Sequence, residues 1–404
     1  MTTSGDPATS RLRIGNHERT FTLHKPRRAG DGQLPLVIVL HGHSPDASGA
    51  TMRAWTSFDA NADEWGIAVA YPDGYRGGWA DGRGVTAAEA DGVDDIAFLC
   101  ALIDWSAERH GTRADHTIIA GVSNGAIMAH RLALQASERI AAFAAVAGAL
   151  PAALREVQPT HAVSALLING TADPLVPLGG GYSRHRGPNG ELRGRVLSQH
   201  DTTEHWRALN RCGSGPDFET VEETPSSPDR PGWLGLTRHI ITGGVGGTKV
   251  ETLTVHGGGH TWPGSVAVSD PQAAAAIGLT AQNLDAAAEI VRFAGPLLDA
   301  PARRRSGLFQ KRRWGAAGCS AGWAAIAVTR PPHVSPAHQA CGRGGVTGTP
   351  SRDRLAAALG ETMTGALRRV RRGGGRPCPN HMIQVPSRHF LKDASMGPRI
   401  APTE

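Results

Sequence analysis

Residues 116–135 read HTIIAGVSNGAIMAHRLALQ and combine three patterns in direct succession. Residues 116–120 form a short β-prone apolar run, and residues 126–135 carry apolar side chains at helical spacing, so we expect a strand followed by a helix. Between them, Gly121 to Gly125 match Gly-x-Ser-x-Gly, a sharp turn that needs glycine backbone and lifts a serine hydroxyl above a sheet. Ser123 is therefore a candidate nucleophile.

A second copy of the motif, GCSAG at residues 318–322, lacks this context. Ser320 follows an arginine-rich segment, and no strand pattern precedes it. Short motifs of this kind arise by chance, and this one has catalytic meaning only where a buried strand enters it and a helix leaves it. We therefore assign the nucleophile to Ser123 and not to Ser320.

Residues 11–300 alternate short β-rich apolar runs with helix patterns. This alternation predicts an α/β fold with a mostly parallel central sheet and helices on both faces. The expected strands span residues 36–40, 66–71, 116–120, 142–147, 165–168 and 250–255. The expected helices span residues 93–109, 125–135, 203–209 and 281–298, with Asp94 and Asp95 as N-cap and first-turn acid of the first one.

A serine hydroxyl needs a histidine to accept its proton and a carboxylate to orient that histidine. On a serine elbow of this kind the acid and then the histidine follow in the chain. Asp173 ends the apolar run ALLINGTAD (165–173), and His260 lies in the glycine loop that follows residues 250–255. Both are expected at the carboxyl edge of the sheet, where open α/β sheets place their sites. By itself, Asp173 would be better explained as an Asx turn before Pro174.

Acyl transfer also needs N–H donors for the tetrahedral oxyanion. The predicted donors are the backbone amide of Asn124 and that of His43, in the loop LHGHS (40–44) after the first central strand. The side chain of His41 could act in catalysis or pack under this loop.

We expect neither a metal nor a cofactor. His256 and His260 are four residues apart, but the three glycines between them break the helix that such spacing needs, and no nearby acid supplies a third ligand. The five cysteines include no CxxC pair, which argues against a zinc site.

Charge divides the 404-residue chain unevenly. The formal net charge is +6, but residues 302–404 hold 18 of the 42 Lys and Arg and only 4 of the 36 Asp and Glu. We therefore expect a flexible N-terminus (1–10), one catalytic domain (11–300) and a basic Arg/Gly/Pro-rich tail (301–404) that is disordered. Contact of this tail with nucleic acid or a membrane is the lesser alternative.

Six segments together resemble the polyhydroxybutyrate depolymerase and feruloyl esterase family. They are LHGHS (40–44), YPDG (71–74) with Trp79, VDDIAFLCALID (93–104), GVSNGAIMAHRLA (121–133), NGTADPLVP (169–177) and GGGHTWPG (257–264). The resemblance spans about residues 11–298, and GGGHTWPG after a serine elbow is its most specific part. It implies the α/β-hydrolase fold and hydrolysis of carboxylic esters by Ser123, His260 and Asp173.

Members of that family divide among polyester, feruloyl or acetyl-xylan, and simpler ester substrates, so a small-molecule or oligomeric ester is the expected partner. Residues 147–165 leave no room for a large lid, although residues 178–200 could cover part of an open cleft. Trp79 and Trp262 could stack on an aromatic acyl or sugar group, or pack in the core instead. Two hypotheses compete with this one. The chain could be a peptidase of the same fold, or a non-catalytic binding protein that works through its basic tail.

Two features depart from the family pattern. Members are usually exported, but residues 1–10 lack the basic and apolar parts of a signal peptide, so we expect a cytoplasmic protein or a chain whose start is missing. The stretch 206–212 resembles the family's Trp…Asn-Gly-Cys segment, but the later cysteine that would pair with Cys212 is replaced near Gly243 and Gly244. Cys212 is therefore expected to be a free thiol, as suits a reducing compartment.

Overall fold

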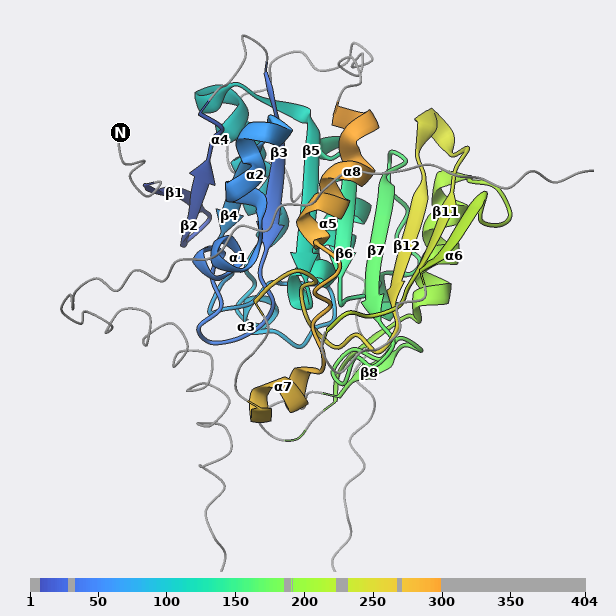
Figure 1. Cartoon of the computed structure of the whole chain (residues 1–404). Coiled ribbons are helices and arrows are strands. Elements are labelled where there is room, and N and C mark those ends of the chain that lie inside the picture. Colours follow the sequence, from blue (N-terminus) through green and yellow to red (C-terminus); the bar gives the residue numbers. More distant parts are fainter. Residues whose placement is uncertain are drawn as a thin grey trace, which may run out of the picture. The chain divides into compact units, whose positions relative to one another are not determined.

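The computed structural model describes residues 8–27, 33–184, 190, 192–222, 232–266 and 271–298. A ten-stranded sheet runs through this part of the chain in the order β1-β2-β4-β3-β5-β6-β7-β12-β11-β10 (Figure 1). Its strands are β1 (Thr9–Ile14), β2 (His17–His24), β3 (Leu34–Leu40), β4 (Ala68–Pro72), β5 (Thr112–Val122), β6 (Ala142–Val146), β7 (Ser164–Gly170), β10 (Phe218–Glu222), β11 (Leu236–Ile241) and β12 (Val250–Val255). A separate hairpin joins β8 (Gly181–Ser183) to β9 (Arg193–Val196).

The six central strands pair in parallel, and the outer ones are antiparallel. Parallel pairs link β4, β3, β5, β6, β7 and β12 in that order, whereas β1, β2, β11 and β10 add antiparallel edges. Strands β6 and β7 are buried along their whole length because helices cover both faces of the sheet. The predicted α/β-hydrolase fold is confirmed, and each of the six predicted strands corresponds to one of these parallel strands.

Two groups of helices form the layers on either side of the sheet. One core cluster packs α4 (Asp95–His110), α5 (Asn124–Gln135) and α6 (Gln199–Asn210) against one face. A second cluster packs α1 (Gly49–Trp55), α2 (Phe58–Trp65) and α8 (Ala286–Leu298) against the other, and Figure 1 shows α2 and α8 in front of the strands. The short helices α3 (Ala87–Ala90) and α7 (Pro271–Ile277) lie in loops at the carboxyl end of the strands.

The expected division of the chain into an N-terminus, a catalytic domain and a tail can be compared with the structure at both ends of the catalytic domain. Strand β1 begins at Thr9, inside the segment expected to be a flexible N-terminus. The predicted tail, residues 301–404, lies outside the described residues. Among the residues that are described, no helix is long and apolar enough to cross a membrane.

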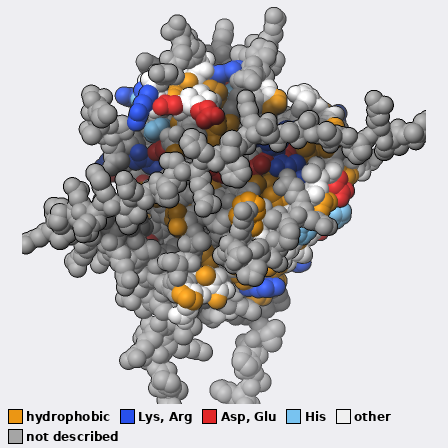
Figure 2. All heavy atoms as spheres, viewed as in Figure 1, with side chains coloured by type: hydrophobic (Ala, Val, Ile, Leu, Met, Phe, Trp, Pro, Cys, Tyr) orange, Lys and Arg blue, Asp and Glu red, His pale blue; other side chains and the backbone are white. Residues whose placement is uncertain are grey.

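The face in Figure 2 carries acidic and basic side chains close to one another, not one patch of a single sign. Charges of opposite sign also pair below the surface, where Arg238 and Arg292 both contact the buried carboxylate of Glu251 and Lys249 lies 3.8 Å from it. Cys212 is a buried free thiol, as predicted. A Cβ built on Gly244 would lie 2.8 Å from its sulfur, so Gly244 occupies the place opposite this thiol.

Candidate active site

The nucleophile elbow has the backbone that its motif predicts. Ser123 adopts φ 55° and ψ −119°, a conformation that costs free energy for a residue with a side chain and is typical of strained functional turns. Strand β5 ends at Val122 and α5 begins at Asn124, so the serine stands alone between strand and helix. A Cβ on Gly121 would lie 2.4 Å from the Gly125 carbonyl group, so only glycine allows the helix to return this closely.

The structure brings the three predicted triad residues together. Ser123 Oγ lies 2.8 Å from His260 Nε2, and His260 Nδ1 lies 2.8 Å from Asp173 Oδ2. Because the carboxylate accepts at Nδ1, the imidazole carries its proton there and leaves Nε2 free to accept from the serine hydroxyl. The side chains of His260 and Asp173 are 9% and 2% exposed, so this hydrogen-bonded chain is largely shielded from water.

Asp173 holds its own loop as well as the histidine. Its Oδ1 accepts hydrogen bonds of 2.8 Å from the backbone amides of Leu175 and Val176, whereas Oδ2 faces His260. The Asx-turn interpretation and the triad interpretation of this residue therefore both describe its geometry. One oxygen fixes the turn, and the turn aims the other oxygen at the imidazole.

The glycine loop after β12 carries His260 across the end of β7. A Cβ on Gly170 would lie 2.1 Å from the carbonyl oxygen of Gly258, so the two backbones touch. The amide of His260 donates to the carbonyl of Ile277, which pins the loop from the other side. His256, by contrast, bonds Thr237 and lies away from the triad. No group of three metal-ligating side chains occurs among the described residues.

The two segments that carry the predicted oxyanion donors adjoin Ser123. Asn124 is the first residue of α5, where backbone N–H groups have no partner within the helix and the helix dipole favours negative charge. A Cβ on Gly42, the residue before His43, would lie 3.3 Å from Ser123 Cβ. The loop after β3 therefore packs directly against the nucleophile.

The predicted substrate-binding role of Trp79 and Trp262 is wrong for this structure. Their side chains are 0% and 2% exposed, so neither ring offers a face to a substrate. Trp262 packs in the core against Phe58, and the indole N–H of Trp79 donates to the carbonyl of His41. Burial is favourable because each ring removes a large apolar area from water, and the polar atom of Trp79 is satisfied by His41.

The sequence analysis missed a buried ion pair beneath the elbow. Asp81 accepts from the side-chain amide of Asn124 at 2.6 Å and pairs with the guanidinium of Arg83 at 2.7 Å. Burial raises the pKa of Asp81, and the charge of Arg83 opposes that rise. Arg83 is only two residues away, but the burial of Asp81 depends on its contact with Asn124 of the distant helix α5, which no local pattern predicts.

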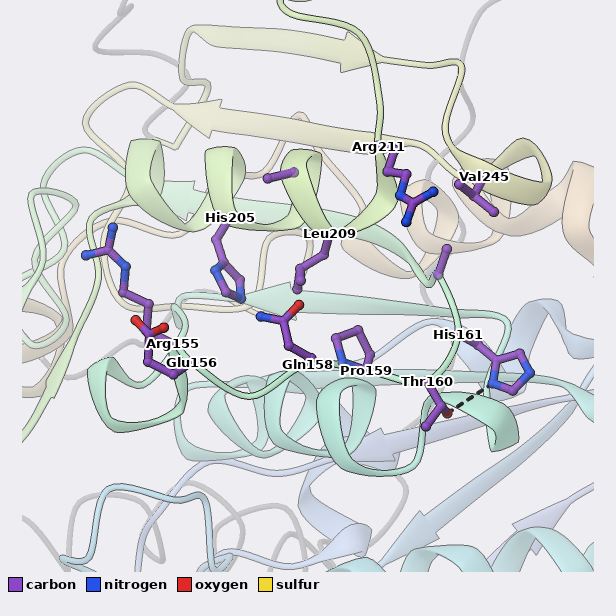
Figure 3. A pocket seen from close by; sticks show the side chains of 12 residues that line it. Arg155, Glu156, Gln158, Pro159, Thr160, His161, His205, Leu209, Arg211 and Val245 are labelled. Carbon is purple, nitrogen blue, oxygen red and sulfur yellow. Dashed lines mark hydrogen bonds between the residues drawn. The ribbon is translucent and has the colours of Figure 1, made fainter.

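A cavity of about 610 Å³ lies elsewhere, between α6 and the loop 155–162 (Figure 3). Its lining includes His205 and Leu209 of α6 and Arg211, the residue that follows this helix, but none of the predicted site residues. The end of α6 is tied to the start of β7, where Asn210 bonds Val163, whereas the triad lies at the carboxyl ends of the strands. This cavity is therefore separate from the triad.

Comparison with known proteins agrees with the geometry. Residues 32–186 match the family model described as phospholipase/carboxylesterase. The protein named "Putative esterase NocK" of Nocardia uniformis subsp. tsuyamanensis is 33% identical over 283 residues, which are 69% of this chain and 80% of that protein. The chain belongs to the same family of α/β-hydrolase esterases as this relative. The matched region contains β3, the elbow and Asp173 and ends before His260.

Two further similarities are weaker. The "Bifunctional acetylxylan esterase/xylanase XynS20E" of Neocallimastix patriciarum is 25% identical over 142 residues, 35% of this chain and 20% of that protein. The solved structure "Acetyl xylan esterase from Aspergillus awamori" is 12% identical, with a TM-score of 0.44, and the match covers 67% of this chain and 98% of that one.

Proposed function

We propose that this chain is a serine esterase that cleaves carboxylic esters through a covalent acyl-enzyme on Ser123. The observation that carries the proposal is the pair of 2.8 Å contacts that link Ser123 to His260 and His260 to Asp173 on a strained elbow. A hydroxyl beside a base, with the base oriented by a third group, is the arrangement that activates a serine.

The reaction takes place in two acyl-transfer steps. Ser123 Oγ attacks the ester carbonyl carbon while His260 Nε2 takes the hydroxyl proton, and the carbonyl electrons move onto an oxyanion held by the amides of Asn124 and His43. Collapse of this intermediate breaks the bond to the alcohol, which leaves with the proton from His260. Water then attacks the acyl-enzyme with His260 as base, and the acid is released as Ser123 regains its proton.

A polyhydroxybutyrate depolymerase-like activity on short hydroxyacyl esters is the first candidate for the substrate. Its support is the sequence resemblance, together with a short connection between β6 and β7 that carries only a single 3₁₀ turn at residues 152–154. The base of the hairpin β8–β9 packs on Ile127 of α5 through Val176 and Val196, and Tyr182 on β8 is 46% exposed. This hairpin would form one wall of an otherwise open entrance.

Acetyl-xylan or feruloyl ester hydrolysis is the second candidate. The observation in its favour is the similarity of part of the chain to a protein named as an acetylxylan esterase/xylanase. Tyr182 is more exposed than the two buried tryptophans, and although the guanidinium of Arg195 lies over its ring at 5.7 Å, the other face could stack on a sugar or an aromatic acyl group.

The test is hydrolysis by the full chain of p-nitrophenyl acetate and butyrate, methyl ferulate, acetylated xylan and soluble hydroxybutyrate oligomers. Ser123→Ala should lower kcat at least about 10⁴-fold, since the nucleophile is lost. Ser320→Ala, in the second copy of the motif, is the matched control and should retain full activity. Hydrolysis that survives Ser123→Ala would refute the mechanism. The ester that the wild type hydrolyses with the highest kcat/KM would show which of the two substrate classes is correct.

A further inference from the structure

Trp79 lies at a junction between the two sides of the predicted oxyanion hole. Its indole N–H donates to the carbonyl of His41 at 2.9 Å. Its backbone N–H donates to Asn124 Oδ1 at 2.7 Å, and its carbonyl accepts from Asn124 Nδ2 at 3.2 Å. All three polar groups of this buried residue are therefore bonded to the two residues that carry or precede the oxyanion donors.

The imidazole ring of His41 in turn fixes the peptide unit that contains the His43 amide. Its Nε2 accepts from the backbone amide of Gly74 at 2.8 Å, so the ring proton resides on Nδ1, which donates to the Gly42 carbonyl at 2.7 Å. Burial lowers the pKa of His41, which favours this neutral form. The Gly42 carbonyl and the His43 N–H belong to one planar peptide unit, so fixing the carbonyl fixes the direction of the N–H.

The other side of the hole is anchored through the side chain of Asn124. Its Nδ2 also donates to Asp81 Oδ2 at 2.6 Å, and Asp81 is held by Arg83. Gly78, the residue before Trp79, lies close to both residues that carry the donors. A Cβ built on it would lie 2.8 Å from His43 Cδ2 and 3.3 Å from Asn124 Oδ1. The segment 78–81 thus spans the distance between the two donors.

We infer that Trp79 is a positioning residue of the oxyanion hole, which holds the amides of His43 and Asn124 in a fixed mutual geometry. This inference rests on the proposed esterase function. Oxyanion donors stabilise the transition state because they are already oriented when charge develops, so a loosened donor lowers kcat more than it weakens substrate binding. Trp79 itself touches no reacting atom, and its role is confined to orientation.

The test compares Trp79→Phe with Trp206→Phe. Both tryptophans are fully buried, and each donates its indole N–H to one buried acceptor, which is His130 Nδ1 for Trp206. Complete removal of an oxyanion donor costs about 10²–10³ in kcat, so Trp79→Phe should lower kcat about tenfold with little change in KM. Its affinity for a trifluoromethyl ketone, whose adduct places an oxyanion in the hole, should fall by a similar factor. Trp206→Phe should lower the melting temperature comparably and leave kcat and ketone affinity unchanged.

A second pair of variants keeps the test decisive if Trp79→Phe does not fold. His41→Gln loses the donor to Gly42 but retains an acceptor for Gly74, whereas His41→Asn retains the donor near the place of Nδ1. Rescue of kcat by Asn and not by Gln supports the inference. If hydrolysis depends on Ser123, but kcat is unchanged by Trp79→Phe or by the two His41 substitutions, the inference is overturned and the proposed function is not. Absence of Ser123-dependent hydrolysis would overturn the proposed function together with it.

Discussion

Asp173 shows how one side chain serves stability and chemistry at once. Sequence patterns suggested an Asx turn and a triad acid as alternatives, but the two carboxylate oxygens divide these tasks between them. Such a division cannot be predicted from spacing, because it depends on where the glycine loop of residues 256–260 crosses the end of β7.

Asp173→Asn separates the two tasks. The asparagine side-chain oxygen still accepts from the amides of Leu175 and Val176, but its NH₂ group faces His260 and favours the wrong imidazole tautomer. We expect kcat to fall by about 10³–10⁴ with the melting temperature almost unchanged. Asp173→Ala should also destabilise the fold by about 1–2 kcal/mol, because two backbone donors lose their acceptor. Equal melting temperatures for the two variants would contradict this account.

A buried histidine outside the triad predicts a specific acid sensitivity. Burial lowers the pKa of His130 from 6.5 to about 3, and His205 adds a smaller effect of the same sign. The unfolded chain takes up this proton as pH falls below about 6.5 while the folded chain does not, so stability is present above that pH and is lost as pH falls toward about 3.

His130→Asn tests this sensitivity, since asparagine keeps a hydrogen-bond acceptor for Trp206 but does not titrate. Urea unfolding should show the wild type losing about 2–3 kcal/mol relative to the variant between pH 6.5 and about pH 4.5. Parallel stability curves for the two proteins would mean that His130 is not the responsible group.

The central strands were predictable because their burial on both faces of the sheet requires a simple pattern in the sequence. Strands buried on both faces require continuous apolar runs, and β6 and β7, which are buried throughout, lie within two residues of their predicted bounds. Strands β1, β2, β10 and β11 at the two ends of the sheet were missed because most of their side chains are exposed or only partly buried and several are charged, so they lack an apolar run. Helices α1 and α2, with seven and eight residues, are too short to establish a clear helical period.

Contacts from distant parts of the chain explain why the start of α4 was predicted only in part and why the two tryptophans were assigned to the wrong role. Asp94 caps α4 as predicted, by accepting from the amide of Ala97. Asp95, predicted as a first-turn acid, is also held in a buried pair with Arg19 at 2.6 Å, which comes from a strand that the sequence analysis did not find. Trp79 and Trp262 were misassigned because a tryptophan near a site motif has the same local sequence whether it lines a cleft or supports it.

The contact between the end of β7 and the glycine loop predicts how one added methyl group would act. Gly170→Ala should displace the loop, because its Cβ would lie 2.1 Å from the carbonyl oxygen of Gly258. We expect a loss of about 1–3 kcal/mol in stability and a fall of roughly 10²-fold in kcat from a displaced His260. Gly179→Ala, at an exposed glycine with no atom within 4 Å, should change neither. Wild-type kcat in Gly170→Ala would show that the loop tolerates the shift.

At the scale of the whole molecule, charge and chemistry occupy different parts of the chain. Residues 1–301 hold 24 basic and 32 acidic side chains, whereas residues 302–404 hold 18 basic and 4 acidic ones. Every residue that we assign to catalysis or to its support precedes residue 301. An esterase that works through its triad should therefore keep its hydrolytic activity when residues 301–404 are deleted, whereas a non-catalytic binding protein that works through its basic segment has no such activity and loses its function.

Removal of residues 301–404 should leave kcat and KM for p-nitrophenyl butyrate within about twofold of the full chain, because α8, the last described element, ends at Leu298. Binding to a heparin column at low salt should be lost, since the remaining chain is acidic and polyanion binding follows basic charge. The control is the full chain with Ser123→Ala, which should bind heparin as the wild type does and hydrolyse nothing. A deletion variant that is folded but inactive would contradict this account, because it would place part of the catalytic requirement in residues 301–404.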